Sequence, residues 1–168
     1  MTIFNPSSSG AWSVLGDTTT TNLQTNIDFT SLPACKVIEV YVWLKDATAG
    51  DSVLVRLNND NSAAYTTQRF LGNGALALAQ TLAGQTGFLL GTLSTATFCT
   101  GKFTIVNAAE AVTSKKILSQ WEDGDGAISR ANSCLTPVTG AVSRITVLND
   151  GGNNFSIGSR VIILGVRV

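Results

Sequence analysis

Short segments in which apolar and polar residues alternate recur along this 168-residue chain, with turn-forming residues between them. Side chains of a strand alternate between its two faces, so this pattern predicts strands with one face in a core. An antiparallel β-sandwich has this spacing of strands and turns, whereas βαβ units do not. The strands are expected over residues 11–15, 23–29, 36–44, 52–57, 65–70, 86–92, 96–99, 102–106, 113–121, 142–148 and 161–164, with a further extended piece beginning at 127–130.

In two segments the sequence is compatible with either a helix or a loop. Residues 75–82 contain good helix formers, with Leu78 and Leu82 four positions apart, and we expect a short helix or an irregular loop there. Residues 107–112 begin with Asn107 and carry Glu110 three positions later, as in a helix capping box. The residues that follow do not sustain a helical period, so we expect a hairpin loop, with a helix as the alternative.

Two of the predicted strands are apolar on both faces. In residues 36–44, one face has aliphatic residues and the other has Val37, Glu39, Tyr41 and Trp43. We expect this second face to be covered by a sheet, a loop or another subunit. Residues 161–164 are also apolar on both faces, which predicts a strand in the middle of a sheet.

Charge and histidine content exclude several classes of function. The chain has 11 basic and 11 acidic residues, and this balance argues against binding to nucleic acid or to an anionic membrane surface. No apolar run is long enough to span a membrane, and no secretory signal is evident at the N-terminus. The sequence has no histidine, the commonest general base and metal ligand. The three cysteines, Cys35, Cys99 and Cys134, are expected to be buried, reduced thiols, although a disulfide stays possible.

The remaining candidate sites each have a structural explanation. The turn with Asp123 and Asp125 could hold Ca²⁺, but it lacks the spacing of an EF-hand, and we expect a solvated turn. No spacing rule pairs the acidic residues into a glycosidase site, and the cysteines lack the pattern of a zinc site. We therefore expect no enzymatic activity, no cofactor and no metal. Three tryptophans could form a sugar-stacking platform, but core packing is the favoured explanation: Trp12, Trp43 and Trp121.

The first ten residues form a separate segment. Ile3 and Phe4 are two isolated apolar residues in front of a stretch rich in Pro, Ser and Gly, and such a segment has no core of its own. The favoured interpretation is an N-terminal arm over residues 1–10 that docks Phe4 on a neighbour, and the alternative is a loose tail. The remaining residues, 11–168, are expected to form a single domain.

Three stretches resemble the jelly-roll domain of virion proteins from tailed bacteriophages, and together they run through most of residues 10–168. The first is the strand 52–57 with its polar turn, which carries Arg56, Asn58 and Asp60 and is followed by Tyr65. The second is the predicted hairpin over residues 101–119. The third is the C-terminal turn and strand, with Gly151, Gly152, Asn154, Phe155, Gly158, Ser159 and Gly165. The final strand lacks the aromatic residue that the family often has there.

The resemblance implies an all-β, single antiparallel jelly-roll-like β-sandwich and a place in the virion, after assembly in the host cytoplasm. Proteins of this family serve as capsid cement or as head-spike and tail-tip modules. No fibre or coiled coil precedes the domain, which starts at its own Met1, so we expect a capsid cement or decoration protein. Its expected partners are the major capsid protein and further copies of itself, with a trimer favoured. The alternative is a receptor- or glycan-binding module. The turn with Arg56, Asn58 and Asp60 is expected to mark the fold and not a ligand site.

Overall fold

The computed structural model describes residues 11–72, 75–124 and 129–168, and the described chain is all-β, with antiparallel pairing in both of its sheets. This confirms the predicted fold class as an antiparallel sandwich. The strands are β1 (Trp12–Thr19), β2 (Asn26–Phe29), β3 (Cys35–Leu44), β4 (Ser52–Leu57), β5 (Tyr65–Gly72), β6 (Ala77–Gln85), β7 (Phe88–Thr92), β8 (Cys99–Val106), β9 (Lys116–Glu122), β10 (Ser129–Leu135), β11 (Ile145–Asn149) and β12 (Arg160–Arg167).

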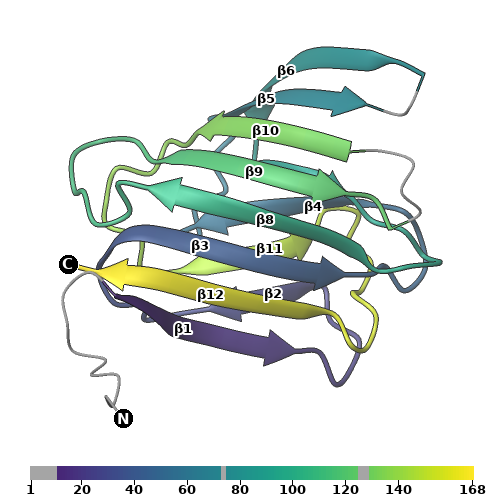
Figure 1. Cartoon of the computed structure of the whole chain (residues 1–168), viewed down its shortest axis with the longest axis horizontal. Helices are drawn as coiled ribbons and strands as arrows, with labels where there is room; N and C mark the ends of the chain where they lie inside the picture. The colour runs from purple at the N-terminus through teal and green to yellow at the C-terminus, as the bar shows by residue number, and fades with distance from the viewer. Residues whose placement is uncertain (1–10, 73–74, 125–128) are drawn as a thin grey trace, which may run out of the picture.

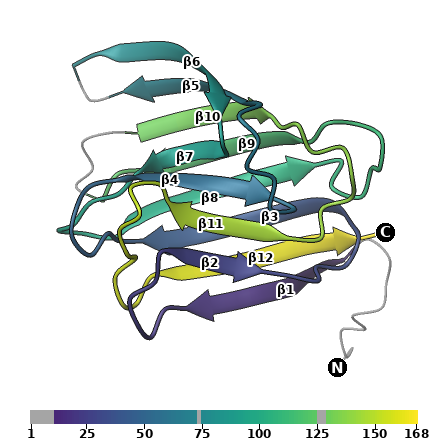
Figure 2. The same ribbon diagram turned by 180° about the vertical axis from the view of Figure 1, so that it is seen from behind.

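The two sheets differ in size. The large sheet has eight strands in the order β1-β12-β3-β8-β9-β10-β5-β6, and the small sheet has four in the order β2-β11-β4-β7. The small sheet lies behind the lower part of the large sheet in Figure 1 and in front of it in Figure 2, while the β5–β6 hairpin extends beyond it. The large sheet therefore has strands that no second layer of the described residues covers.

The hydrophobic core lies between the sheets and follows the alternation seen in the sequence. In β3 every second side chain points inward, and Ile38, Val40 and Leu44 are completely buried. The small sheet contributes residues such as Val55 and Phe88, which are also completely buried. Strand β12 lies between β1 and β3, as expected of an interior strand. The outward residues of β12 and β3 are only partly buried, and Trp43 is 39% exposed, so none of the described elements covers their second face.

Several expected element boundaries are wrong. Most of the expected helix or loop over residues 75–82 is instead strand, because β6 begins at Ala77 and pairs with β5 from Gly72 and Ala77 onward. Strand pairing there overrides the intrinsic helix preference of Ala and Leu. Residues 96–98 and 113–115 lie outside the strands, whereas β1 continues to Thr19 and β10 continues to Leu135. Asn107 has a positive φ of 59° and belongs to a turn, so the alternative helix over 107–112 is also wrong.

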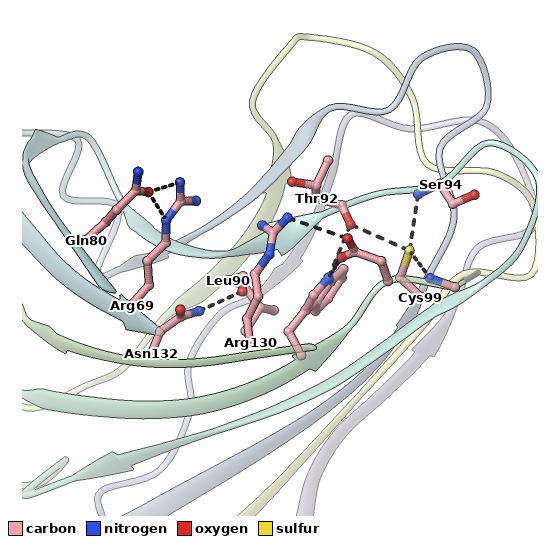
Figure 3. A network of polar contacts seen from close by, with 11 residues as sticks. Arg69, Gln80, Leu90, Thr92, Ser94, Cys99, Arg130 and Asn132 are labelled. Atoms are coloured by element: carbon pink, nitrogen blue, oxygen red, sulfur yellow. Dashed lines mark hydrogen bonds and ion pairs between the residues drawn. The ribbon is translucent and has the colours of Figure 1, made fainter. Parts of the chain in front are cut away.

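Side chains of the large sheet close the free edge of β7. Asn132 Nδ2 donates to Leu90 O at 2.8 Å and to Leu89 O at 3.3 Å, and Trp121 Nε1 donates to Thr92 O at 3.2 Å. Figure 3 shows Asn132 reaching Leu90 from the neighbouring sheet. These bonds satisfy carbonyl groups that an edge strand would otherwise leave unpaired.

Asp46 organises the turn that carries the chain from β3 in the large sheet to β4 in the small sheet. Its carboxylate is buried and accepts backbone N–H groups from Thr48 at 3.0 Å, Ala49 at 3.2 Å and Asp51 at 3.3 Å. Asn149 Nδ2 donates a further bond at 2.9 Å. Burial alone would raise the pKa of Asp46, but these hydrogen bonds outweigh it and the pKa is lowered.

Replacing Asp46 with Asn should lower the free energy of unfolding at pH 7 by about 1–3 kcal/mol, because a charged acceptor of several buried donors is lost. A carboxylate whose pKa is lowered on folding stabilises the protein above its unfolded pKa, and this contribution disappears as the pH falls through the folded pKa. The difference between wild type and Asp46→Asn should therefore shrink below about pH 4. Urea unfolding at pH 7 and pH 3 measures it.

Asp150→Asn is the matched control, because Asp150 lies exposed in an adjacent turn. It should change stability by less than about 0.5 kcal/mol at either pH. If Asp46→Asn lowered the free energy of unfolding equally at pH 3 and pH 7, the charge of the Asp46 carboxylate would not be what stabilises this turn.

Candidate functional site

The outer face of the large sheet, which points away from the small sheet, carries an unusual number of exposed apolar side chains. Six large ones are at least 39% exposed, and they come from β1, β3, β5, β9 and β10. Monomeric soluble proteins rarely leave so many on one face unless the face binds something. The six are Trp12, Val14, Trp43, Phe70, Leu118 and Leu135.

The strand register places these residues in rows across the outer face. One row runs from Val14 through Leu164, Glu39 and Thr104 to Leu118. Directly opposed residues in antiparallel strands point to the same face, so a row is a line of neighbouring side chains. A second row starts at Trp12 and ends at Leu135 and Thr66. A third contains Tyr41, Lys102, Gln120, Ala131 and Phe70, and a fourth contains Trp43, Thr100 and Glu122.

The first two rows place four exposed apolar side chains at one end of the face, interspersed with the polar residues Glu39, Thr104 and Lys116. We call this area the apolar end and define it by Trp12, Val14, Leu118 and Leu135, which are 48–64% exposed. Figure 1 shows that it lies where β1 begins and β12 ends, at the left of the view. Ala11, the first described residue, directly precedes Trp12 in this area.

The other two rows form a groove. It has a volume of 710 Å³, and its lining includes the aromatic residues Tyr41, Trp43 and Phe70 and the polar residues Lys102, Gln120 and Glu122. Trp43 on β3 and Phe70 on β5 lie four strands apart in the sheet order. At about 4.8 Å per strand they are about 19 Å apart along the sheet. We call this feature the aromatic groove.

A buried polar cluster supports the floor of the aromatic groove. Trp121 points inward from β9, and its Nε1 donates to Asp123 Oδ1 at 2.7 Å. Asp123 Oδ2 lies 3.5 Å from Arg130 Nη2, and both side chains are largely buried. Burial lowers the pKa of Arg130, while the Asp123 carboxylate opposes that shift. Figure 3 shows this cluster reaching Thr92 and Cys99.

These contacts correct two expectations from the sequence. Asp123 is not in a solvated turn, because it is 9% exposed and paired with Arg130, while Asp125 lies outside the described residues. Trp121 is a core residue as expected, but Trp12 and Trp43 are exposed on the outer face. In the described part of the chain, no group of three or more potential metal-binding side chains is close enough together to hold an ion.

The polar turn after β4 ties together separate parts of the small sheet. Arg56 Nε donates to Thr86 O at 2.9 Å, and Asp60 Oδ1 accepts from Ser62 N at 2.8 Å. Asn58 has a positive φ of 52° and binds the segment before β11. Its Oδ1 accepts from the backbone N–H groups of residues 143 and 144 at 2.9 and 3.2 Å, and its Nδ2 donates to the carbonyl of residue 141 at 2.8 Å. The side chains of this turn thus bind the chain itself.

Other predicted positions lie apart from the outer face. Ile3 and Phe4 are outside the described residues. The cysteines are buried thiols, and no disulfide joins them in the described structure, as expected. Burial raises the pKa of Cys134 to about 11 and also raises that of Cys35, so neither has the thiolate character of a reactive cysteine.

Comparison with known proteins does not identify a family. No family model matches the chain, and no curated protein matches it. Among solved structures, a chain titled "Structure of infectious bursal disease virus Gt strain" aligns with 12% sequence identity and a TM-score of 0.12. The alignment covers 98% of this chain and 38% of that one. In the described residues, no helix is long and apolar enough to cross a membrane.

Replacing Asn58 with Ala should lower the free energy of unfolding by about 2–4 kcal/mol, because it removes the side-chain bonds and leaves a left-handed backbone without Asn or Gly. Asn58→Gly loses the same bonds but tolerates the positive φ. It should be more stable than Asn58→Ala by about 1 kcal/mol. Urea unfolding measures both.

Asn59→Gly is the matched control, since Asn59 has a similar φ of 59° and an exposed side chain. It should change stability little. If Asn58→Ala were as stable as wild type, the turn would not hold the two segments together.

Proposed function

We propose that this chain is a jelly-roll structural protein of a bacteriophage virion that acts by binding and not by catalysis. The strand order supports the jelly roll. Without β5, β6, β9 and β10, eight strands are left in two four-stranded sheets, with orders β1-β12-β3-β8 and β2-β11-β4-β7. Eight antiparallel strands divided between two facing sheets are the plan of a jelly roll, a fold common in viral capsid proteins.

The four additional strands belong to two insertions. β5 and β6 lie between β4 and β7 in the sequence, and β9 and β10 lie between β8 and β11. All four add to the same side of the large sheet and widen its outer face. Because fold alone does not fix function, the function must be argued from this widened face.

The proposal that this chain is a capsid decoration protein rests on the apolar end. Aliphatic side chains such as Val14, Leu118 and Leu135 suit a protein partner, which can bury them. The proposed partner is the major capsid protein on the outer surface of the shell. The arm with Ile3 and Phe4 precedes Ala11 at this end and would extend the contact. Binding across the joints between capsid subunits would stabilise the shell in the virion.

Lysine in place of Val14 or Leu118 should weaken binding to the shell by at least about tenfold, because burying each apolar side chain contributes about 1.5–3 kcal/mol. The probe is a purified shell assembled from the major capsid protein of the same bacteriophage. Co-sedimentation over a range of protein concentrations gives the dissociation constant. A chain that lacks residues 1–10 should also bind more weakly.

Ile157→Lys is the control, because Ile157 is equally exposed but lies in the turn before β12, away from the apolar end. It should bind shells as wild type does. Unchanged binding by both Val14→Lys and Leu118→Lys would overturn docking through the apolar end.

A second candidate function, binding of a receptor glycan, is favoured by the aromatic groove. Its exposed rings can stack on sugar faces, and Lys102, Gln120 and Glu122 can form hydrogen bonds with hydroxyl groups. The groove crosses several strands and is long enough for an oligosaccharide of a few units. This function would suit a head-spike or tail-tip protein.

If the groove binds a glycan, Trp43→Ala and Phe70→Ala should each reduce the signal on a glycan array at least about tenfold, as expected when a central aromatic contact is lost. Phe98→Ala removes an exposed aromatic residue outside the groove and should keep the signal. Absence of any reproducible sugar signal with the wild-type protein would rule against this second function.

A further inference from the structure

Strand β6 is an exposed edge of the large sheet, and from Ala77 to Leu82 the described structure shows none of the usual protection against pairing with another strand, because its irregularity at Gly84 comes only after Leu82. It runs over nine residues, most of them exposed, and contains neither a charged residue nor a proline. The sequence has no charged residue between Arg69 and Lys102. An edge strand of this kind presents unpaired backbone groups to any strand that approaches it.

The other three sheet edges are protected. β1 has a bulge between Val14 and Gly16 and an ion pair of 2.7 Å between Asp17 and Arg160. β2 has only four residues, and its Asp28 pairs with Arg144 at 2.6 Å. The carbonyl groups of β7 are bound by side chains of the large sheet, as described above. β6 is therefore the edge that can accept a further strand.

The sequence of β6 is nearly the same in both directions around Gln80. Residues 77–83 read Ala-Leu-Ala-Gln-Thr-Leu-Ala, and reversal exchanges only Ala79 and Thr81. Two copies of such a strand match when they run antiparallel.

We propose that β6 pairs antiparallel with β6 of a second copy of this chain, about a two-fold axis that passes beside Gln80. In this register Leu78 of each copy faces Leu82 of the other, and Ala79 faces Thr81. Gln80 faces Gln80 across the axis. Cross-strand side-chain pairs stabilise such a ladder.

The hairpin already fixes the residues next to the axis. Gln80 Oε1 accepts from Arg69 Nε at 2.8 Å and also from Arg69 Nη2, so its carboxamide is oriented within its own chain. Arg69 lies one strand further from the axis, which keeps the two like charges apart. The interface uses the same surface on both copies and closes on itself. This geometry gives a dimer, in place of the trimer expected from the sequence.

Analytical ultracentrifugation over about 1–200 μM tests the inference, because a small interface made mainly by one strand pair should give a micromolar dissociation constant. We expect wild type to convert from monomer to dimer in this range. Leu78→Lys should weaken the dimer at least about tenfold, because it replaces both leucine pairs with charged side chains. Leu23→Lys changes an exposed leucine outside β6 and should dimerise normally. Circular dichroism and urea unfolding confirm that each variant is folded.

Single cysteines at positions 79, 80 and 81 test the register. Under mild oxidation, Gln80→Cys should form a disulfide-linked dimer, while Ala79→Cys and Thr81→Cys should not, because only residue 80 faces itself. A mixture of the Ala79→Cys and Thr81→Cys proteins should link to each other. A wild-type protein that stays monomeric, a trimer, or preferential linkage at position 79 or 81 alone would overturn the proposal. These outcomes do not depend on what the outer face binds.

Discussion

Trp121 is the contact on which the packing of the two sheets depends. Its ring lies against Gly91 of the small sheet and Gly101 of the large sheet, where an added Cβ would come within 2.2 and 2.6 Å of it. Its Nε1 bonds Thr92 and Asp123, and Asp123 pairs with Arg130. One side chain thus fills the gap between the sheets, closes the edge of β7 and fixes a buried charge. The small sheet ends here, and the large sheet continues past it.

This mismatch in size produces the outer face. A β-sandwich with two equal sheets would bury most of its apolar surface between them. Here the inserted strands β5, β6, β9 and β10 extend one sheet only, and they supply Phe70, Leu118 and Leu135 to the exposed surface. The core is complete without these three side chains. These side chains can therefore stay exposed and bind a partner at little cost to the stability of the fold, which is consistent with their proposed role.

Strands whose inward residues are apolar can be predicted from the sequence. Strands whose inward residues form polar contacts, or that have no covered face, are not predicted. In β10 the inward positions are Arg130, Asn132 and Cys134, and two of these bind the cluster and the edge of β7, so the segment shows no apolar alternation. β6 has no covered face, so nothing selects a strand-like pattern, and its Ala and Leu residues suggest a helix. The aromatic groove could not be predicted, because its residues come from separate strands and meet only through the register.

The proposed pairing of β6 and the proposed function of the outer face support each other in one respect. A two-fold axis perpendicular to the large sheet keeps the outer faces of both copies on the same side of a continuous sheet. Two apolar ends, or two aromatic grooves, would then face the same surface. On a shell or a cell surface with repeated sites, the second contact forms at a high effective concentration, so two weak contacts can give avidity well above either one. Dimerisation through β6 would thus let a small domain with modest contacts bind a repetitive surface tightly.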